Sequence, residues 1–600
     1  MIRTGDEAPA RHLLSRALVM DIGRRSKYFR LQVALLFLFS VISIGRIIFT
    51  YFVFNQTWDE PVHVASGMEW LQQGTYTYED LHPPLARVAV AIGPYLSGIR
   101  LSSRDLRPAA LVDGGNAVFA AHGNYLQTLA LARLGVLPFF LIGLWAVWYW
   151  TCSLYDGWTA VAAAGLFTML PPVLGHAGLA TTDMAITAAL VLSICAFTSW
   201  LDRPTAKRAI LLGIVIAMAI LSKFSALLFL PACGLLTLLC WMFARERATR
   251  PHRQEFILRL KSFAIAGLIC AALILMCYRF SFHPVTGYGQ RPHQFLDHIF
   301  GHKGKWHEVA YRVVETTPVP VPEFLHGIEQ AGARATLPTG MYLLGQVQSG
   351  GWWYFFPVAL MVKTPIAFLI LVIFGGNTTV RRWRERNRDW RVLAPLASSV
   401  ALFLICLPTK FNIGLRHILP IYPFLSILAG CGIKELWCGS HTRLLRRVLA
   451  GTLATWVLIS TTAAHPDYLA YFNELAADHP ERILVDSDLD WGQDLLRLRD
   501  ILQARRVEHF SIAYNGSADL SRMNLPAFNV LASCTPTNGW VAISVLKLQM
   551  THASPGCGGF TWLKDYKPVA VAGKSIRLYW IPSIHGGDAP NVAQRIATGH

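Results

Sequence analysis

An apolar stretch near the N-terminus and the polar turn that follows it decide the fold. Residues 30–53 read RLQVALLFLFSVISIGRIIFTYFV, and residues 57–61 read TWDEP. A run of about 20 apolar residues is long enough to cross a bilayer as a helix. Roughly thirty mostly polar residues precede the run, which is unlike a cleavable signal peptide, so we interpret it as a retained membrane helix. The carboxylates of Asp59 and Glu60 then follow directly on a membrane exit.

Further apolar stretches predict an all-α polytopic membrane protein with about 11 transmembrane helices. Of the 600 residues, 53% are hydrophobic and only 15% are charged, below the ~25% charged content that is usual in soluble domains. The expected spans are residues 30–53, 125–151, 158–174, 182–200, 208–222, 224–243, 262–281, 353–375, 391–408, 415–433 and 447–464.

The distribution of positive charge predicts the orientation of these spans. A formal net charge of +18 could indicate a nucleic-acid partner, but the Lys and Arg residues lie in short loops between apolar runs, so we expect no nucleic acid. With the N-terminus in the cytoplasm, the inner segments hold 26 Lys and Arg residues and the short outer loops hold three. This asymmetry predicts a cytoplasmic N-terminus. Eleven spans then place the C-terminus outside, and helical spans indicate an inner or plasma membrane.

Three regions follow from this topology. Residues 1–29 form a cytoplasmic segment, residues 30–464 form the membrane domain, and residues 465–600 form an extracytoplasmic domain. Long outer loops are expected at 54–124 and 282–352. The tail should be a small α/β domain, with a helix at 492–506 and strands at 483–485, 509–514, 540–548 and 575–581. Cys534 and Cys557 could pair there or stay apart, and the sequence leaves both open.

The first outer loop carries the leading site candidates. Asp59 and Glu60 are either the N-terminal acids of a helix over 61–74 or carboxylates that take a proton or hold a metal. His63 lies three residues after Glu60, on the same helix face, where it could contact substrate or simply sit at the interface.

A stiff turn and a cation follow in the same loop. His82 precedes two prolines that fix the backbone, and Arg87 follows one turn later. Arg87 could meet a lipid phosphate, and both residues could equally be interfacial anchors.

Asp183 opens the fourth expected span on the same outer side. A carboxylate at that depth is costly unless it is paired. Asp183 either caps its helix or converges with Asp59 on a proton-transfer or metal site.

Three basic or imidazole side chains belong to the outer ends of spans, and one further cation is expected deeper in a span. Lys223 lies in a tight outer turn, and Arg416 and His417 open the tenth span. Lys363 is expected ~15 Å into the eighth span, at 1.5 Å per helical residue. The cations could bind a phosphate or pyrophosphate, or could be snorkelling anchors.

The tail contains the acidic run DSDLDWGQD at residues 486–494. Its spacing matches neither an EF-hand nor a P-loop. The acids could cap the helix that follows. Alternatively, Asp490 could bind sugar hydroxyls with Trp491 as a stacking platform.

Together the short motifs resemble the GT-C superfamily of membrane glycosyltransferases. The resemblance is to the branch that uses polyprenyl-phosphate donors, which includes protein O-mannosyltransferases and the bacterial aminoarabinose transferase of lipid A. It runs in order through residues 30–464, and the tail resembles bacterial members of the branch. The motifs that carry it are WDEP (58–61), HPPL (82–85), TDMA (182–185), SKFS (222–225) and LRHILP (415–420).

The resemblance implies an inverting transfer of a sugar from a polyprenyl-phosphate carrier at the outer face of a bacterial inner membrane. The acceptor would be a lipid, a protein or a glycan. Asp59 would be the general base, and Glu60 and Asp183 would position the acceptor or a metal. Lys223, Arg416 and Arg87 would hold the departing lipid phosphate. A divalent metal, with Asp59, Glu60 and Asp183 as its ligands, is left open.

One motif departs from the resemblance, and two other functions compete with it. The aminoarabinose transferase has a Lys where this chain has His82, so lipid A is not carried over as the acceptor. A transporter or flippase of lipid-linked sugars is the first rival, although no internal repeat is present. A receptor-like membrane protein with a sugar-binding tail is the second, and it would leave Asp59 dispensable.

Overall fold

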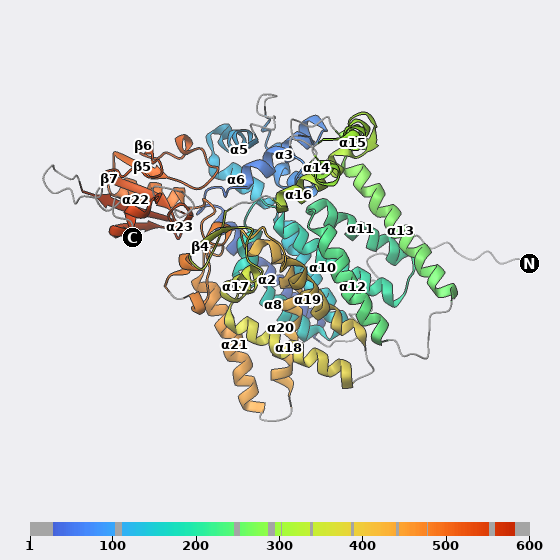
Figure 1. Cartoon of the computed structure of the whole chain (residues 1–600). Coiled ribbons are helices and arrows are strands. Elements are labelled where there is room, and N and C mark those ends of the chain that lie inside the picture. The colour runs from blue at the N-terminus through green and yellow to red at the C-terminus, as the bar shows by residue number, and fades with distance from the viewer. Residues whose placement is uncertain are drawn as a thin grey trace, which may run out of the picture.

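The computed structural model describes residues 28–582, except 78, 102–110, 245–252, 286–293, 302, 337–339, 386–388, 440–442, 477 and 551–557. Nearly all of the expected cytoplasmic segment 1–29 therefore lies outside the described residues. Figure 1 shows a large group of helices with a small sheet domain, formed by the C-terminal part of the chain, at one side.

Every expected span is helical over most of its length, which confirms a polytopic helical membrane protein. By length and apolar composition, seven of the described helices can cross a membrane, or up to nine when two bent pairs each count as one span. This is fewer than the 11 expected, partly because α11 and α19 are short. The helices are α2 (Phe29–Thr50), α6 (Tyr125–Leu134), α7 (Leu137–Leu154), α8 (Gly157–Phe167), α9 (Pro171–Ala177), α10 (Asp183–Asp202), α11 (Ala206–Ser222), α12 (Ala226–Ala244), α13 (Arg253–Cys277), α17 (Phe355–Lys363), α18 (Ile366–Glu385), α19 (Ala394–Cys406), α20 (Tyr422–Cys438) and α21 (Arg443–Ala463).

The expected continuous span 353–375 is wrong, because the chain breaks there into α17 and α18, which meet at 110°. The break follows from Pro365, since a proline disfavours the helical conformation of the residue before it. Thr364 is accordingly extended, with φ −113° and ψ 135°. Lys363 therefore ends a short helix instead of lying in the middle of a long one. A similar bend of 67° separates α8 from α9, just before Pro171.

The two long loops form short helices that gather at the upper end of the molecule in Figure 1. The helix predicted after Asp59 is confirmed as α3, which ends at Gly74 with a left-handed φ of 73°. Glycine is the residue that takes up such a conformation without steric cost. The loop elements are α3 (Glu60–Gln73), α4 (Pro84–Leu96), α5 (Leu111–Ala120), α14 (Gln294–Phe300), α15 (Lys305–Thr316) and α16 (Pro322–Thr336). Two antiparallel strand pairs accompany them, β1 (Phe282–His283) with β2 (Val319–Pro320) and β3 (Gly340–Leu343) with β4 (Gln346–Ser349).

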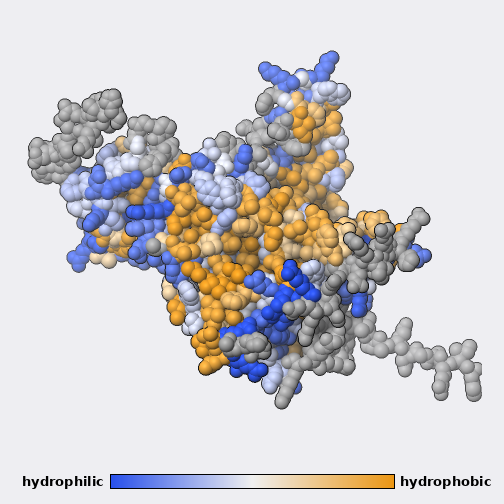
Figure 2. Space-filling model, turned by 60° about the horizontal axis from the view of Figure 1, so that its bottom comes forward, coloured by the Kyte–Doolittle hydropathy of each residue, from blue (hydrophilic) through white to orange (hydrophobic). Residues whose placement is uncertain are grey.

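The outside of the helical part is apolar. Figure 2 shows hydrophobic side chains across much of the face in view and a more hydrophilic surface on the sheet domain at the left. An exposed apolar surface of this extent fits a lipid environment and not water. Large exposed apolar residues on the outward helices include Phe37, Phe49, Phe256, Leu268, Leu444 and Ile459.

The C-terminal region is an α/β domain, as predicted. Its five strands lie in the order β6-β5-β7-β9-β8. Neighbouring strands β6, β5 and β7 are parallel, and β9 runs antiparallel to both of its neighbours, β7 and β8. The elements are α22 (Leu495–Ala504), β5 (His509–Ala513), β6 (Ala527–Val530), β7 (Gly539–Ser544), α23 (Val545–Gln549), β8 (Ala570–Ala572) and β9 (Ile576–Ile581).

Three details of this domain differ from or extend the sequence expectations. The predicted strand 540–548 is wrong beyond Ser544, because α23 begins at Val545. The predicted strand 483–485 is wrong: this segment follows the 3-10 turn Pro480–Arg482 and leads into another at Asp486–Asp488. Leu484 and Val485 are buried without strand pairing, so their apolar character reflects core packing. Cys534 is disulfide-bonded, and Cys557 lies outside the described residues.

Candidate active site

Asp59 precedes α3 and points to a cation from a distant part of the chain. Its Oδ2 lies 2.6 Å from Nη1 of Arg416, at the start of the 3-10 segment η6 (Leu415–Ile421). Asp59 forms no side-chain cap on its own helix, so the capping alternative is not what holds it. Burial would raise the pKa of the Asp59 carboxyl, but the charge and hydrogen bond of Arg416 outweigh burial and hold the pKa below its usual value.

Asp183 approaches the same guanidinium nitrogen of Arg416. Its Oδ1 accepts a hydrogen bond of 2.6 Å from Nζ of Lys223, and its Oδ2 is 4.0 Å from Nη1 of Arg416. The structure thus brings Asp59, Asp183, Lys223 and Arg416 together, from four separate elements. The side chain of Asp183 is 1% exposed, and a buried carboxylate of this kind is tolerated because it is paired with cations.

Two aromatic side chains, Trp491 and His176, pack beside these charged groups. The guanidinium of Arg416 stacks over the ring of Trp491 with its carbon 4.3 Å from the ring centroid. His176 on α9 packs against Trp491, with ring centroids 6.2 Å apart, and its Nδ1 is 4.0 Å from Oδ2 of Asp183. Trp491 is therefore a buried platform for Arg416.

Three buried nitrogen atoms around this arrangement have no hydrogen-bond partner among the residues that the structure describes. They are Nε of Arg416, Nδ1 of His176 and Nε2 of His417. A buried polar group without a partner is costly and calls for an explanation. A bound anionic ligand would supply acceptors for these groups.

A second cluster joins the candidate residues of α3 and α4. Nε of Arg87 donates to Nδ1 of His63 at 3.0 Å, and its Nη2 lies 3.1 Å from Nδ1 of His82. Arg87 is 1% exposed and also forms an ion pair with Glu79. Burial and the nearby Arg87 lower the pKa of His63 to about 3, so this imidazole is neutral at physiological pH. Burial and Arg87 likewise hold the pKa of His82 well below its usual value.

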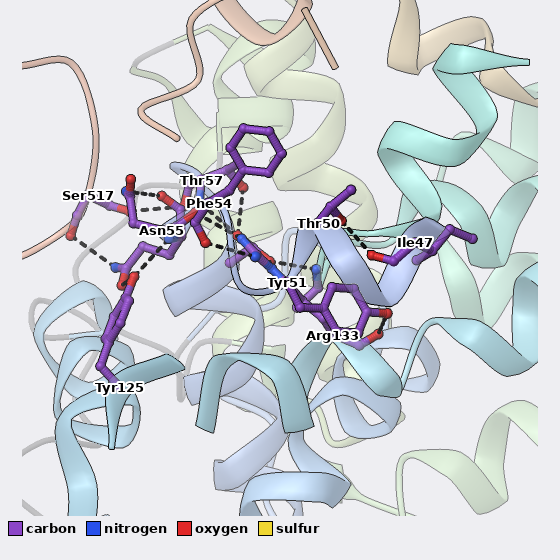
Figure 3. Close-up of polar contacts among 12 residues, drawn as sticks. Ile47, Thr50, Tyr51, Phe54, Asn55, Thr57, Tyr125, Arg133 and Ser517 are labelled. Carbon is purple, nitrogen blue, oxygen red and sulfur yellow. Dashed lines mark hydrogen bonds and ion pairs between the residues drawn. The ribbon is translucent and has the colours of Figure 1, made fainter. Parts of the chain in front are cut away.

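Glu60 turns away from Asp59 into a buried network. Its carboxylate forms a two-pronged pair with Arg133, at 2.8 and 2.9 Å, and accepts a hydrogen bond from the amide of Ala180 at 2.8 Å. Arg133 also donates to the carbonyls of Phe54 and Asn55. Figure 3 shows the Arg133 side chain reaching the turn that leads to Thr57. Glu60 and Arg133 thus anchor the loop that presents Asp59.

The same turn is also held from the C-terminal domain. Ser517 Oγ donates to the carbonyl of Thr57 at 3.2 Å, and Asn55 Nδ2 donates to the carbonyl of Gly492 at 2.7 Å. Figure 3 shows Ser517 and Tyr125 on the same side of this turn. The loop of Asp59 is therefore fixed between the membrane helices and the sheet domain.

Two further sequence candidates hold backbone groups of the C-terminal domain. Lys363 Nζ donates to the carbonyls of Leu469 at 2.8 Å and Asp488 at 2.6 Å, so its ammonium is already occupied. Asp490 is fully buried and accepts from the amides of Leu546 and Gly492. In this arrangement neither side chain is directed to the site of Asp59.

The carboxylates do not form an evident metal site. Among the described residues, no group of three or more His, Cys, Asp or Glu side chains could hold a metal ion. Asp59 and Asp183 each face a cation, and Glu60 faces Arg133. The set Asp59, Glu60 and Asp183 therefore does not converge on one point.

Three residues of this region were not among the sequence candidates. His176 and Arg133 lie inside or beside apolar runs, where a polar side chain is itself a signal of a functional or buried paired group. Asp486 belongs to the acidic run 486–494 and is an electrostatic neighbour of Arg416 and Asp59. Its place depends on the docking of the sheet domain, which the sequence does not specify.

One family model matches part of the chain. Residues 36–286 match the model of the dolichyl-phosphate-mannose-protein mannosyltransferase family. The chain is similar to that family over these residues. The matched stretch includes Asp59, Asp183 and Lys223, whereas Arg416 and Trp491 lie beyond it. No curated protein matches the chain.

Solved structures of other proteins are similar to a larger part of the chain. The oligosaccharyltransferase of Archaeoglobus fulgidus in its apo form is 15% identical with a TM-score of 0.44, covering 74% of this chain and 55% of its own. The chain thus spans just over half the length of that protein. ArnT from Cupriavidus metallidurans, bound to undecaprenyl phosphate, is 11% identical with a TM-score of 0.46, covering 94% and 100%. The Pmt1-Pmt2 protein O-mannosyltransferase complex of S. cerevisiae, bound to the sugar donor, is 10% identical with a TM-score of 0.48, covering 72% and 90%.

Proposed function

We propose that the protein is a membrane glycosyltransferase that moves a sugar from a polyprenyl-phosphate carrier to an acceptor by inverting transfer. The proposal rests mainly on the ion pairs that Asp59 and Asp183 form with Arg416 and Lys223 at the ends of membrane helices. Such a site offers a proton acceptor beside cations that can hold a phosphate. The family of residues 36–286 is named for a dolichyl-phosphate sugar donor, which agrees with this chemistry.

Arg416 and Lys223 are the groups that bind the lipid phosphate in this proposal. Both are largely buried, with side chains 10% and 12% exposed, where charge interactions are stronger than in water. The unpartnered Nε of Arg416 provides a donor for a phosphate oxygen. As the bond between the sugar and the phosphate breaks, negative charge grows on the leaving oxygen, and these cations stabilise it.

Asp59 is the general base in this proposal. The acceptor hydroxyl attacks the anomeric carbon, its proton passes to Asp59, and the electron pair of the broken bond leaves with the lipid phosphate. In the free protein Arg416 lowers the basicity of Asp59. Binding of the phosphate would share the charge of Arg416 between two anions and so raise the basicity of Asp59. Donor binding would thereby activate the base.

The other candidates take supporting roles. Glu60 positions the Asp59 loop through Arg133, and Asp183 orients Lys223 and Arg416. His63, His82 and Arg87 are proposed to line the part of the site that binds the acceptor. Nε2 of His417, which has no hydrogen-bond partner among the described residues, is available to a ligand.

The proposed location is a bacterial inner membrane, with the N-terminus in the cytoplasm and the sheet domain outside. The charge asymmetry of the loops supports this orientation. The acceptor would then be a lipid, a protein or a glycan of the cell envelope.

Reconstitution into liposomes tests the proposal against transport. Purified protein is mixed with a panel of synthetic undecaprenyl phosphate sugars, including mannose, and with washed membranes as the source of acceptor. Transfer of label to membrane material with release of undecaprenyl phosphate supports the proposal. Movement of the intact lipid-linked sugar between leaflets without release would identify a flippase instead.

A further inference from the structure

The four acids of the run 486–494 differ in what their carboxylates contact. Asp488 accepts from the amide of Leu415, Asp490 accepts from the amides of Leu546 and Gly492, and Asp494 accepts from Ser575. These three carboxylates join separate segments of the protein. Asp486 differs: among the described residues, only the adjacent amide of Ser487 donates to its carboxylate, at 2.6 Å to Oδ1. Its other carboxylate oxygen is left for a ligand or a proton.

Asp486 is held beside Arg416 by close contacts of the neighbouring backbone. Ser487 Oγ donates to the carbonyl of Ile413 at 2.6 Å, and Asp488 binds the amide of Leu415. A Cβ atom at Gly414 would clash with the Ser487 hydroxyl, so the two segments touch. The segment that carries Asp486 is thus packed directly on the segment that carries Arg416.

The backbone of Asp486 has a strained conformation. Its φ is +53°, in the left-handed region that residues other than glycine seldom adopt. Such strain is kept only where the surroundings impose it, and it is found at functional sites. A hydrogen bond from Asp490 N to the Asp486 carbonyl, at 2.8 Å, closes the turn that follows Asp486.

We propose that Asp486 is a second proton-accepting carboxylate of the active site, supplied by the C-terminal domain. This role of Asp486 rests on the proposed glycosyl transfer. In that transfer the acceptor O–H bond breaks as the acceptor oxygen bonds to the anomeric carbon. The lipid phosphate leaves with the electron pair of the bond between the sugar and the phosphate. Asp59 takes the proton and passes it through water to Asp486, which releases it to solvent. Asp59 then returns as a carboxylate to its ion pair with Arg416.

The electrostatic surroundings fit this order of transfer. Burial raises the pKa of Asp486 to about 7; Arg416 acts to lower it, while Asp488 and Asp59 act to raise it. The pKa of Asp59, in contrast, lies below its usual value. A proton on Asp59 therefore moves downhill to Asp486, and Asp486 can release it near neutral pH.

The test uses Asp486→Asn in the full-length protein, with the donor that the wild type consumes. Asn is well suited to the left-handed backbone and its side-chain oxygen can still accept from Ser487, so the fold should persist. We expect the wild-type rate of undecaprenyl phosphate release to fall on the acid side of about pH 7. The variant should lose about 10²-fold in rate at pH 8, and its profile should lack that acid limb.

Two further variants complete the test. Asp500→Asn removes a carboxylate from an exposed position of α22 and should leave rate and profile unchanged. Asp486→Glu keeps a carboxylate and should restore part of the rate and the acid limb. An Asp486→Asn profile equal to that of the wild type would overturn the role of Asp486 while leaving the glycosyltransferase proposal intact. A wild type that consumes no donor would overturn both.

Discussion

Arg416 and Asp59, which are 357 residues apart in the sequence, form an ion pair with Nη1 and Oδ2 at 2.6 Å. Asp183 lies 4.0 Å from the same Nη1. One guanidinium thus ties the first outer loop and two membrane helices to each other, and its stacking on Trp491 adds the C-terminal domain. The arrangement makes Arg416 the natural meeting point for a phosphate and the base that acts beside it.

Replacing Arg416 by Lys should lower transfer by about 10²-fold, with a raised KM for the donor. Lys keeps the charge, but it lacks the planar guanidinium that stacks on Trp491 and donates to Asp59. Steady-state kinetics on the reconstituted protein measure the effect.

Arg279→Lys is the matched control for that change. Arg279 also stacks over a tryptophan, Trp70, with its carbon 4.1 Å from the ring centroid, but it is exposed and forms no ion pair among the described residues. The Arg279→Lys variant should retain the wild-type rate of transfer. Equal rates for Arg416→Lys and the wild type would refute the phosphate-binding role of Arg416.

Breaking the Glu60–Arg133 pair should destabilise the protein by about 3–5 kcal/mol, because one buried charge is left without its partner. Glu60→Gln and Arg133→Met are the two single variants, and thermal unfolding in detergent is the measurement. The double variant should lose less stability than the sum of the two losses, since no lone charge remains. Strictly additive losses would show that the two side chains do not depend on each other.

Helix α3 and the two carboxylates at its start could be predicted from the sequence, whereas the cations that pair with these carboxylates could not. Pro61 and Gly74 mark the ends of α3 by local rules, and the carboxylates of Asp59 and Glu60 follow a span that composition reveals. The two acids then point to different cations, Arg416 and Arg133, each far away in the sequence. Local spacing contains no information about such long-range pairing.

Lys363 shows a different limit. The apolar run 353–375 has the length and composition of one span, and hydropathy alone cannot tell a straight helix from two that meet at 110°. Pro365 was the available signal, since it disfavours helix at Thr364. The break brings Lys363 to the carbonyls of Leu469 and Asp488, where it supports the C-terminal domain.

His63 should make stability depend on pH. Its pKa is about 3 in the folded protein, against an ordinary value near 6.5. Between these values the unfolded chain binds the proton more readily, so this contribution to stability is complete above about pH 6.5 and is lost as the pH falls toward 3. The loss amounts to about 1.4 kcal/mol per pH unit for one fully shifted group.

His63→Gln isolates this contribution. The Gln side-chain oxygen can accept from Arg87, and no group titrates in its place. The apparent melting temperature of the variant should therefore fall less steeply than that of the wild type between pH 6.5 and 4.5. Parallel curves would mean that His63 is not the buried neutral group described here.

The most direct test of the central claim compares transfer from undecaprenyl phosphate sugar by the wild type, Asp59→Asn and Asp113→Asn. Asp113 is exposed on α5 in the same outer loop, so its replacement controls for the loss of one carboxylate. The account predicts transfer by the wild type and Asp113→Asn, and at least a 10²-fold loss in a folded Asp59→Asn protein. Equal transfer by all three proteins would contradict the assignment of Asp59 as the base.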